Sequence, residues 1–247
     1  MSKVIIFNGD DNNTIKSVQG ITGKEKITFG SDATNTYYYK NLEWVHGAFA
    51  KFTVFKDGEE LGEIELNIPG EHNILNALCA VATGMYCGVT FKQCKESLYN
   101  FKGAGRRFEI LGEYNGAVIV DDYAHHPEEI KACIESIRSL YPDKRICGIF
   151  QPHLYSRTKD FANEFAESLS KLDDVIVLDI YPARELPIKG VTSNLIHRKI
   201  KGKKSVLCKK EDCLNELKLH KFDVLITIGA GNIDQLVNPI TEYLNTL

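Results

Sequence analysis

The ten residues DDYAHHPEEI, residues 121–130, gather an unusual number of ionisable side chains. Two carboxylates, a phenol and two imidazoles precede Pro127, and the apolar run AVIV, residues 117–120, comes directly before them. Carboxylates accept hydrogen bonds, and imidazoles donate and accept them and change charge near neutral pH. The segment is therefore a candidate ligand site at the exit of a buried strand.

Part of this segment also has a purely structural interpretation. Proline is favoured in the first turn of a helix, and Glu128 and Glu129 complement the helix dipole there. Helix initiation accounts for these residues, but not for the two acids, the tyrosine and the histidines. Metal chelation is a further interpretation, although the adjacent His125 and His126 cannot easily chelate side by side. A metal hydrolase would use Asp121, Asp122, His125, His126 and His153.

The second half of the chain alternates between short apolar runs and amphipathic stretches. Residues 106–114 and 117–123 on either side of Asn115-Gly116 predict a hairpin. Strands are predicted near residues 117–120, 145–150, 174–180, 205–208 and 223–229. Helices are predicted at about residues 128–141, 158–171, 192–200, 211–220 and 232–246. Continuous apolar strands that alternate with helices predict an open α/β structure whose mostly parallel sheet is covered on both faces.

Polar segments follow four of these predicted strands. They are DDYAHH (121–126), QPHLYSRT (151–158), YPARELP (181–187) and GAGN (229–232). Ligands bind beyond the carboxyl ends of the strands in such sheets, so we expect these tips at one edge. The candidate site residues there are Asp122, Tyr123, His125, His126, His153, Arg157, Arg184 and Glu185. GAGN is too short for a dinucleotide fingerprint, and either approaches a ligand or makes a tight turn.

The first half of the chain has a different pattern. Residues 3–7, KVIIF, predict a strand, and the alternation in residues 51–66 around Asp57-Gly58 predicts a hairpin. A helix is predicted after Pro69-Gly70, and a second one at about residues 90–101. TGKEKIT, residues 22–28, lacks the full phosphate-loop pattern and is predicted to be a turn.

The glycines of FKGAGRRFE predict a hinge between two domains, residues 1–102 and 103–247. The chain has 247 residues, 43% hydrophobic and 26% charged, with a net charge of −3. That balance predicts apolar cores and argues against general nucleic-acid binding. The basic run KGKKSVLCKK, residues 201–210, is predicted to be a solvated surface.

Cysteine and histidine usage adds further expectations. No two of the seven cysteines form a C-x-x-C pair, which predicts free thiols in a reducing cytosol. The cysteines expected to be small buried side chains are Cys79, Cys87, Cys94 and Cys133. His46 and His220 are expected at the surface. No continuous apolar run reaches the roughly 18 residues of a membrane span, and no secretory signal is evident, so a cytoplasmic protein is predicted.

Four segments in this order together resemble the Mur ligases. They are EHNILNA (71–77), GAGRRFE (103–109), DDYAHHPEEI (121–130) and FQPHLYSRTKDF (150–161), and YPARELPIKG (181–190) adds to the likeness. Mur ligases are cytoplasmic enzymes that build the peptide stem of bacterial peptidoglycan. The resemblance extends over nearly the whole chain.

The resemblance implies an ATP-dependent ligase that joins L-alanine to UDP-N-acetylmuramate through an acyl phosphate. It implies ATP and Mg²⁺ together with these small-molecule partners, and neither nucleic acid nor a membrane. Family members have three domains, of which the second carries the phosphate loop and magnesium ligands. Residues 1–102 resemble part of that central α/β domain, after its loop, and residues 103–247 resemble the Rossmann-like C-terminal domain. Activity is therefore expected to need an N-terminal half that holds most magnesium ligands.

The resemblance also implies roles for individual residues. The residues that would bind ATP are His72, Asn73, Asn76, Arg107 and Asp122. The residues that would bind the amino-acid and muramoyl end are Tyr123, His126, His153, Arg157 and Arg184. His125 would be the catalytic residue, near the reacting phosphate and the incoming amine. Leu154 stands where the family often has a second arginine.

Several structural alternatives stay open. Asn73 and Asn76 are also suited to capping the helix that follows them. Arg106 and Arg107 are also suited to surface ion pairs, Arg106 more than Arg107. His153 follows Pro152 and can be a loop residue bound by backbone. A non-catalytic nucleotide-binding module is the alternative function for the whole chain.

Overall fold

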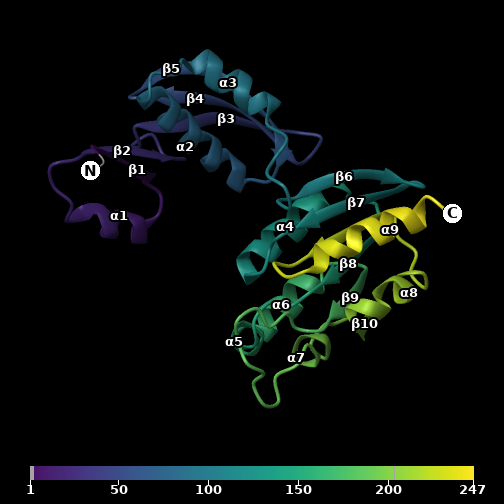
Figure 1. Ribbon diagram of the computed structural model, residues 1–247. Helices are drawn as coiled ribbons and strands as arrows, with labels where there is room; N and C mark the ends of the chain where they lie inside the picture. Colours follow the sequence, from purple (N-terminus) through teal and green to yellow (C-terminus); the bar gives the residue numbers. More distant parts are fainter. Residues whose placement is uncertain (1–2, 203) are drawn as a thin grey trace. The chain divides into compact units, whose positions relative to one another are not determined.

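The computed structural model describes residues 3–202 and 204–247 (Figure 1). The chain divides into two compact units, Met1–Lys102 and Gly103–Leu247. Each unit has its own sheet and its own hydrophobic core. Among the described residues, no helix is long and apolar enough to cross a membrane.

The first unit contains a five-stranded mixed sheet in the order β1-β2-β3-β4-β5. Its strands are β1 (Val4–Asn8), β2 (Glu25–Gly30), β3 (Tyr37–Val45), β4 (Phe49–Lys56) and β5 (Glu59–Pro69). The first three strands are parallel and the last three antiparallel. Its helices are α1 (Asn12–Gln19), α2 (His72–Tyr86) and α3 (Phe91–Asn100).

The predicted hairpin around Asp57-Gly58 is confirmed, since β4 and β5 pair antiparallel on either side of it. Both turn residues have positive φ angles, 50° and 90°, as tight hairpin turns require. The turn predicted at residues 22–28 is wrong, because β2 begins at Glu25. Ile27 and Phe29 of β2 are buried in the core, a two-residue alternation too brief to stand out in the sequence.

The second unit contains a six-stranded sheet in the order β10-β9-β8-β11-β7-β6. Its strands are β6 (Glu109–Tyr114), β7 (Ala117–Asp122), β8 (Ile146–Phe150), β9 (Asp174–Leu178), β10 (Lys204–Cys208) and β11 (Val224–Ile228). All neighbours pair in parallel except β6 with β7, which form a hairpin. The mostly parallel sheet predicted from the alternation is therefore confirmed.

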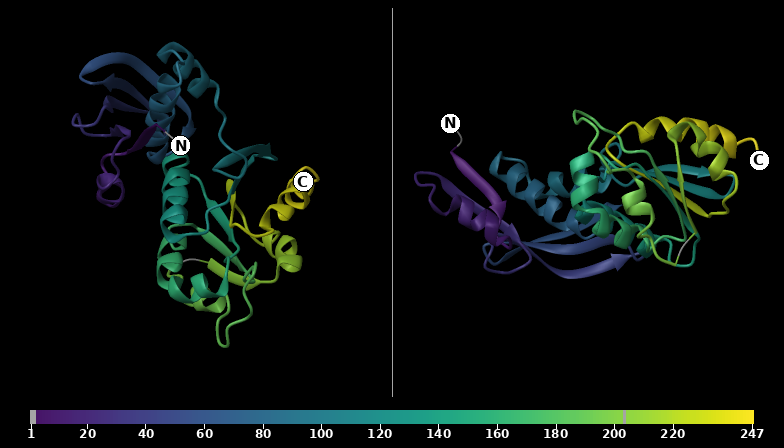
Figure 2. Two further views of the ribbon diagram at one scale, coloured as in Figure 1. Left: turned by 60° about the vertical axis from the view of Figure 1, so that its left-hand side comes forward. Right: turned by 90° about the horizontal axis from the view of Figure 1, so that it is seen from below.

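Helices cover both faces of this sheet (Figure 2). They are α4 (Pro127–Leu140), α5 (Tyr155–Asp160), α6 (Ala162–Leu169), α7 (Asn194–His197), α8 (Cys213–Leu217) and α9 (Val237–Leu244). Alternate residues of β11 show the two sides: Val224 and Ile226 pack in the cluster that contains α4 and α6, whereas Leu225 packs with α8 and α9. A strand buried on both faces explains why its sequence is a continuous apolar run.

Several predicted helices are shorter or interrupted. The helix predicted at 158–171 is two helices, α5 and α6, that meet at Phe161. Those predicted at 211–220 and 232–246 begin as 3₁₀ turns, Lys210–Asp212 and Ile233–Leu236. Hydrophobic spacing alone does not separate these geometries, because 3.0 and 3.6 residues per turn place apolar residues similarly over one turn.

Two expectations about individual side chains are wrong. His220 is buried, and its ring lies between the carboxylates of Asp174 and Glu216, 3.4 and 3.2 Å from their nearest oxygens. Cys87 is exposed, because it lies at the C-terminal end of α2, whereas Cys94 and Cys133 are buried as expected.

Candidate functional site

Three strand ends of the second unit lie side by side. Ile228 of β11 is in register with Asp122 of β7 on one side and with Phe150 of β8 on the other. The next residues continue the pairing, since Gly229 N donates to Asp122 O and Gln151 N donates to Ile228 O, both at 3.0 Å. The segment after β9 joins the same edge, because Tyr181 N donates to Pro152 O at 2.8 Å. The four polar tips therefore share one edge of the sheet.

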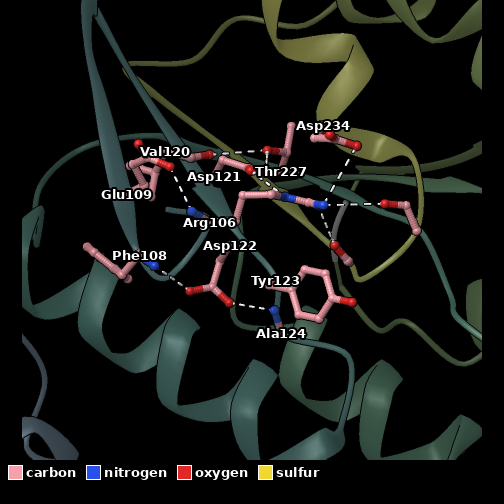
Figure 3. A network of polar contacts seen from close by, with 12 residues as sticks. Arg106, Phe108, Glu109, Val120, Asp121, Asp122, Tyr123, Ala124, Thr227 and Asp234 are labelled. Atoms are coloured by element: carbon pink, nitrogen blue, oxygen red, sulfur yellow. Dashed lines mark hydrogen bonds and ion pairs between the residues drawn. The ribbon is translucent and has the colours of Figure 1, made fainter. Parts of the chain in front are cut away.

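Arg106 lies at the centre of the polar network at this edge (Figure 3). Its Nε atom donates to the buried Asp121 carboxylate at 2.8 Å, and its Nη2 atom donates to Gly229 O at 2.7 Å. Asp121 also accepts a hydrogen bond from Thr227 Oγ1 at 2.5 Å. The alternative of an ion pair for Arg106 therefore holds, but the pair lies away from the open surface, since only 23% of the Arg106 side chain and 3% of the Asp121 side chain are exposed.

Two backbone donors hold the Asp122 carboxylate. Phe108 N and Ala124 N donate to its two carboxylate oxygens, both at 2.6 Å. Burial raises the pKa of Asp122 and outweighs these hydrogen bonds and the charge of Arg107, all of which lower it. Arg107 itself is exposed. Each carboxylate oxygen of Asp122 keeps a second lone pair for a further donor.

His125 has a fixed orientation above the start of α4. Its Nδ1 atom lies 3.0 Å from Tyr123 O and 3.3 Å from Glu129 Oε2. A hydrogen on Nδ1 satisfies either acceptor, which leaves Nε2 as the ring nitrogen that can exchange a proton with a ligand. Glu129 also accepts from the backbone N–H groups of His125 and His126, at 3.0 and 3.1 Å. Burial raises the pKa of Glu129, but these hydrogen bonds together with the nearby charges of His125 and Arg107 lower it by more.

A group of rings connects the tips of β7, β8 and β9. The His125 ring lies 5.4 Å from the Tyr123 ring and 5.8 Å from the His153 ring, centroid to centroid. His153 in turn stacks on Tyr181 at 5.7 Å. Burial lowers the pKa of His153, and the positive charge of Arg157 lowers it further. His126 lies apart from these rings and packs 5.2 Å from Phe161.

The short helix α5 carries another cationic candidate of this edge, Arg157. Arg157 Nη1 donates to His125 O at 3.3 Å, which leaves other guanidinium hydrogens for a ligand. Glu185 stabilises the start of α5, because Ser156 N and Oγ donate to its carboxylate at 2.9 and 2.5 Å. Arg184, next to it in the chain, is exposed. Leu154 precedes α5 with a φ of 72°, a conformation that is costly for a leucine.

The glycines of GAGN are required by packing. A Cβ atom on Gly229 would lie 2.8 Å from Gln151 O, and one on Gly231 would lie 2.7 Å from the Tyr181 ring. Gln151 is itself buried and donates to Asn232 Oδ1 at 3.0 Å. Of the two interpretations of this segment, the tight turn is the one that these contacts support.

The other predicted residues belong to the first unit. His72 begins α2 and is exposed. Asn73 Nδ2 donates to Pro69 O at 2.8 Å, and Asn76 Nδ2 donates to Asn73 Oδ1 at 3.0 Å. Asn73 thus stabilises the turn before the helix, and its oxygen orients the exposed Asn76. A structural role for Asn73 and a ligand role for Asn76 are compatible.

Sequence reasoning missed three contributors to this edge: Arg106 as its central cation, Thr227 and Tyr181. Thr227 is the only hydroxyl residue in β11, an isolated polar residue that could have attracted notice. Tyr181 and Arg106 lie in the segments YPARELP and GAGRRFE, which were singled out, although neither residue was named for the site. Within residues 3–202 and 204–247, no group of three or more His, Cys, Asp or Glu is arranged to hold a metal ion.

Residues 106–231, about half of the chain, match the family model of the Mur ligase glutamate ligase domain. Residues 1–84 match the model of the Mur ligase middle domain. The chain belongs to the Mur ligase family.

Curated relatives of this Mur ligase chain include UDP-N-acetylmuramate–L-alanine ligases. The relative from Porphyromonas gingivalis is 45% identical over 90% of this chain and 49% of its own length. That from Flavobacterium psychrophilum is 39% identical over 96% of this chain and 52% of its own. The chain thus spans about half the length of the curated relatives it matches.

Solved structures of Mur ligases share the fold. The UDP-N-acetylmuramate–alanine ligase of Thermotoga maritima is 27% identical, with a TM-score of 0.73 over 89% of this chain and 48% of that one. A MurF ligase from the same organism, solved in complex with ADP, is 20% identical, with a TM-score of 0.70 over 98% of this chain and 54% of that one. The latter likeness concerns the fold alone.

Proposed function

We propose that this chain is the C-terminal part of an ATP-dependent ligase that joins L-alanine to UDP-N-acetylmuramate. The observation that carries the proposal is the shared edge of the second unit, where carboxylate, imidazole and guanidinium groups meet beyond parallel strands. Its support from comparison is the identity of 38–48% to eight ligases of that name.

The proposed reaction has two steps. The γ-phosphoryl group of ATP passes to the muramate carboxylate, which yields an acyl phosphate and ADP. The alanine amine then attacks the acyl carbon, loses a proton, and inorganic phosphate leaves as the amide forms. Catalysis of this kind depends on positioning the reactants and stabilising charge.

On the nucleotide side, the Asp122 carboxylate accepts hydrogen bonds from the ribose hydroxyls, and Arg107 contacts the phosphates. The carboxylate of Asp122 is fixed by Phe108 N and Ala124 N, so its free lone pairs point in a set direction. Within the first unit, Asn76, with its carboxamide oriented by Asn73, is separately proposed to contact adenine. His72 and Asn73 accompany it at the start of α2.

On the amino-acid side, Arg157 binds a carboxylate through its unused donors. His153 and Tyr123 flank His125, and His126 and Arg184 belong to the outer, muramoyl end. Because its Nδ1 hydrogen is bound to the protein, His125 exchanges a proton at Nε2, where the incoming amine releases one.

The residues of the DDY motif do not fit a magnesium site. The carboxylate of Asp121 is bound by Arg106 and Thr227, and that of Asp122 by two backbone N–H groups. Although Asp122 keeps free lone pairs, the Asp121 carboxylate beside it is bound by the Arg106 cation, and within the described residues no group of three or more His, Cys, Asp or Glu is arranged to hold a metal ion. The magnesium ligands of the proposed ligase therefore belong to its N-terminal half.

Calorimetric titration of the chain with ATP and magnesium tests the nucleotide half-site. Binding is expected for the unmodified chain and is expected to be lost in Asp122→Ala and weakened in Asn76→Ala. Asp143→Ala and Asn100→Ala are the matched controls, because both residues are exposed and lie outside the site. Equal binding in all five proteins would contradict the assignment.

A chimera tests the reaction. The N-terminal half of the Porphyromonas gingivalis relative is joined to this chain, and phosphate release is followed with UDP-N-acetylmuramate, ATP and alanine. Ligation by the chimera, together with negligible turnover by the chain alone, is the expected result. Robust turnover by the chain alone would disprove the proposal that its active site is incomplete.

A further inference from the structure

We infer that Arg106 is a positioning residue which sets the nucleotide side and the amino-acid side of this edge relative to each other. The inference rests on the proposed function, to which it adds a residue that touches neither substrate. The Arg106 side chain contacts several segments that meet at this edge (Figure 3).

The guanidinium of Arg106 joins segments far apart in the chain. It donates to the Asp121 carboxylate on β7 and to Gly229 O after β11, and Gly231 O lies 3.4 Å from Nη1. Asp234 adds a carboxylate oxygen at 3.7 Å. A planar fork with five donors can satisfy such a set, whereas the single nitrogen of a lysine cannot.

The backbone of Arg106 binds the same region. Its N–H donates to Glu109 Oε2 at 2.7 Å, and its carbonyl accepts from Tyr123 N at 2.6 Å. Its φ is 57° and that of Phe108 is 46°, conformations that persist only where neighbouring contacts hold them. Because these backbone contacts hold the segment from Arg106 to Phe108 in place, the Phe108 N–H group points at the Asp122 carboxylate.

Arg106 thus contacts residues next to the nucleotide side and residues on the amino-acid side of the proposed site. On the nucleotide side, Arg107 follows Arg106 in the chain and Asp122 follows Asp121. On the amino-acid side, the guanidinium carbon of Arg106 lies 5.1 Å from the centroid of the Tyr123 ring. Loss of the guanidinium leaves the buried Asp121 carboxylate without its cation and frees the Tyr123 ring.

Arg138 provides a matched control in the same unit. Its side chain is 26% exposed, against 23% for Arg106. It donates to Lys171 O, Lys144 O and the Asp173 carboxylate, so it also joins several segments. These contacts lie near the start of β8, at the opposite edge of the sheet.

The first test is hydrogen–deuterium exchange on the unmodified chain, Arg106→Met, Arg106→Lys and Arg138→Met. Exchange at the Phe108 and Tyr123 amides is expected to rise at least about tenfold in both Arg106 variants, which corresponds to one lost hydrogen bond. Arg138→Met is expected to leave these two amides unchanged. Unchanged amides in the Arg106 variants, or equal loosening in Arg138→Met, would overturn the inference. If Arg106→Met does not fold, Arg106→Lys alone decides.

The second test uses the chimeric ligase. Arg106→Met is expected to lower kcat by about 100-fold and to raise KM for ATP and for alanine together, because misplacement by about 1 Å has that effect. Arg138→Met is expected to alter none of the three constants. An unchanged kcat in Arg106→Met would overturn the inference. If the unmodified chimera does not ligate, the proposed function fails, and the exchange measurement still decides the role of Arg106.

Discussion

The His153 imidazole stacks on the Tyr181 ring, with 5.7 Å between the centroids and 19° between the planes. The same two residues form a parallel β-bridge. The Nδ1 atom of His153 is buried and has no hydrogen-bond partner among the residues that the structure describes. A charged imidazole is therefore disfavoured, and burial, Arg157 and His125 all lower the pKa of His153.

This lowered pKa predicts a pH dependence of stability. The neutral ring favours the folded state fully above the ordinary histidine pKa of about 6.5, and that contribution is lost as pH falls toward the lower folded pKa. His153→Phe keeps a ring against Tyr181 and removes the titration. Urea unfolding at several pH values is expected to show a smaller loss of stability between pH 7 and pH 5 in the variant.

His46→Asn is the control for that measurement. His46 is exposed, and asparagine tolerates its φ of 49°. This variant is expected to keep the pH slope of the unmodified chain. An identical slope in His153→Phe would show that His153 titrates normally in the folded state.

The contact between Gly229 and Gln151 predicts a cost for any side chain at the end of β11. In Gly229→Ala the new Cβ atom would lie 2.8 Å from Gln151 O, and φ is 153°. We expect the free energy of unfolding to fall by about 3 kcal/mol, from backbone strain and overpacking together. Gly190→Ala, at φ 80° in open space, is expected to cost about 1 kcal/mol. Equal costs in chemical denaturation would show that the Gly229 loop relaxes freely.

Substitution of Glu185 is expected to affect the binding of alanine but not that of ATP. Hydrogen bonds from Ser156 lower the pKa of Glu185, so the carboxylate that stabilises the start of α5 is ionised at neutral pH. Glu185→Gln offers a single oxygen to two donors. In the chimeric ligase, KM for alanine is expected to rise about 3- to 10-fold, with KM for ATP unchanged, because Arg157 lies on α5.

The effect of Glu185→Gln on KM for alanine is also expected to depend on pH. A lowered carboxyl pKa means that the contact is present above the ordinary glutamate pKa and is lost as pH falls through the lower, folded value. The difference between variant and parent should therefore shrink in acid. A parallel rise in KM for ATP would instead indicate general disorder of the edge.

Substitutions at the amino ends of the strands are expected to change the stability of the unit but not its affinity for ATP. Asp174 is buried at the start of β9 and is bound by Arg145, with Nη2 2.7 Å from its Oδ2 atom. Asp174→Ala leaves that cation and the buried His220 without this carboxylate, so we expect a loss of about 2 kcal/mol or more. ATP affinity by calorimetry is expected to stay unchanged below the new midpoint of unfolding. Weakened ATP binding in the folded variant would contradict the separation of the two edges.

Much of the second unit was predictable because its signals are local. Apolar runs between amphipathic stretches predicted the parallel sheet, and Asn115-Gly116 predicted the β6–β7 hairpin, whose two turn residues have φ angles of 50° and 77°. Strands that share direction bring their carboxyl ends to one edge, so the polar tips were predicted to meet without knowledge of the strand order.

The interruptions of helices and the burial of single charged residues were not predictable in this way. Phe161 fits the apolar face of a continuous helix, yet the chain breaks there into α5 and α6. His220 was predicted to be exposed, but Asp174 and Glu216 surround it in the folded unit. For His220, the carboxylate of Asp174 comes from β9, more than 40 residues earlier in the chain, so its burial could not be read from the local sequence.

By itself, the sequence determined most of the strands and helices of the second unit, the direction of its sheet and the edge at which DDYAHH and QPHLYSRT meet, because periodicity and turn chemistry act over a few residues. Only the tertiary structure decided which charges are buried and what they hold. Arg106 and Gly229 are 123 residues apart in the chain, and the same arginine suits a surface ion pair or a buried fork equally well until β7 and β11 become neighbours. Burial depends on those distant neighbours, and no local pattern specifies them.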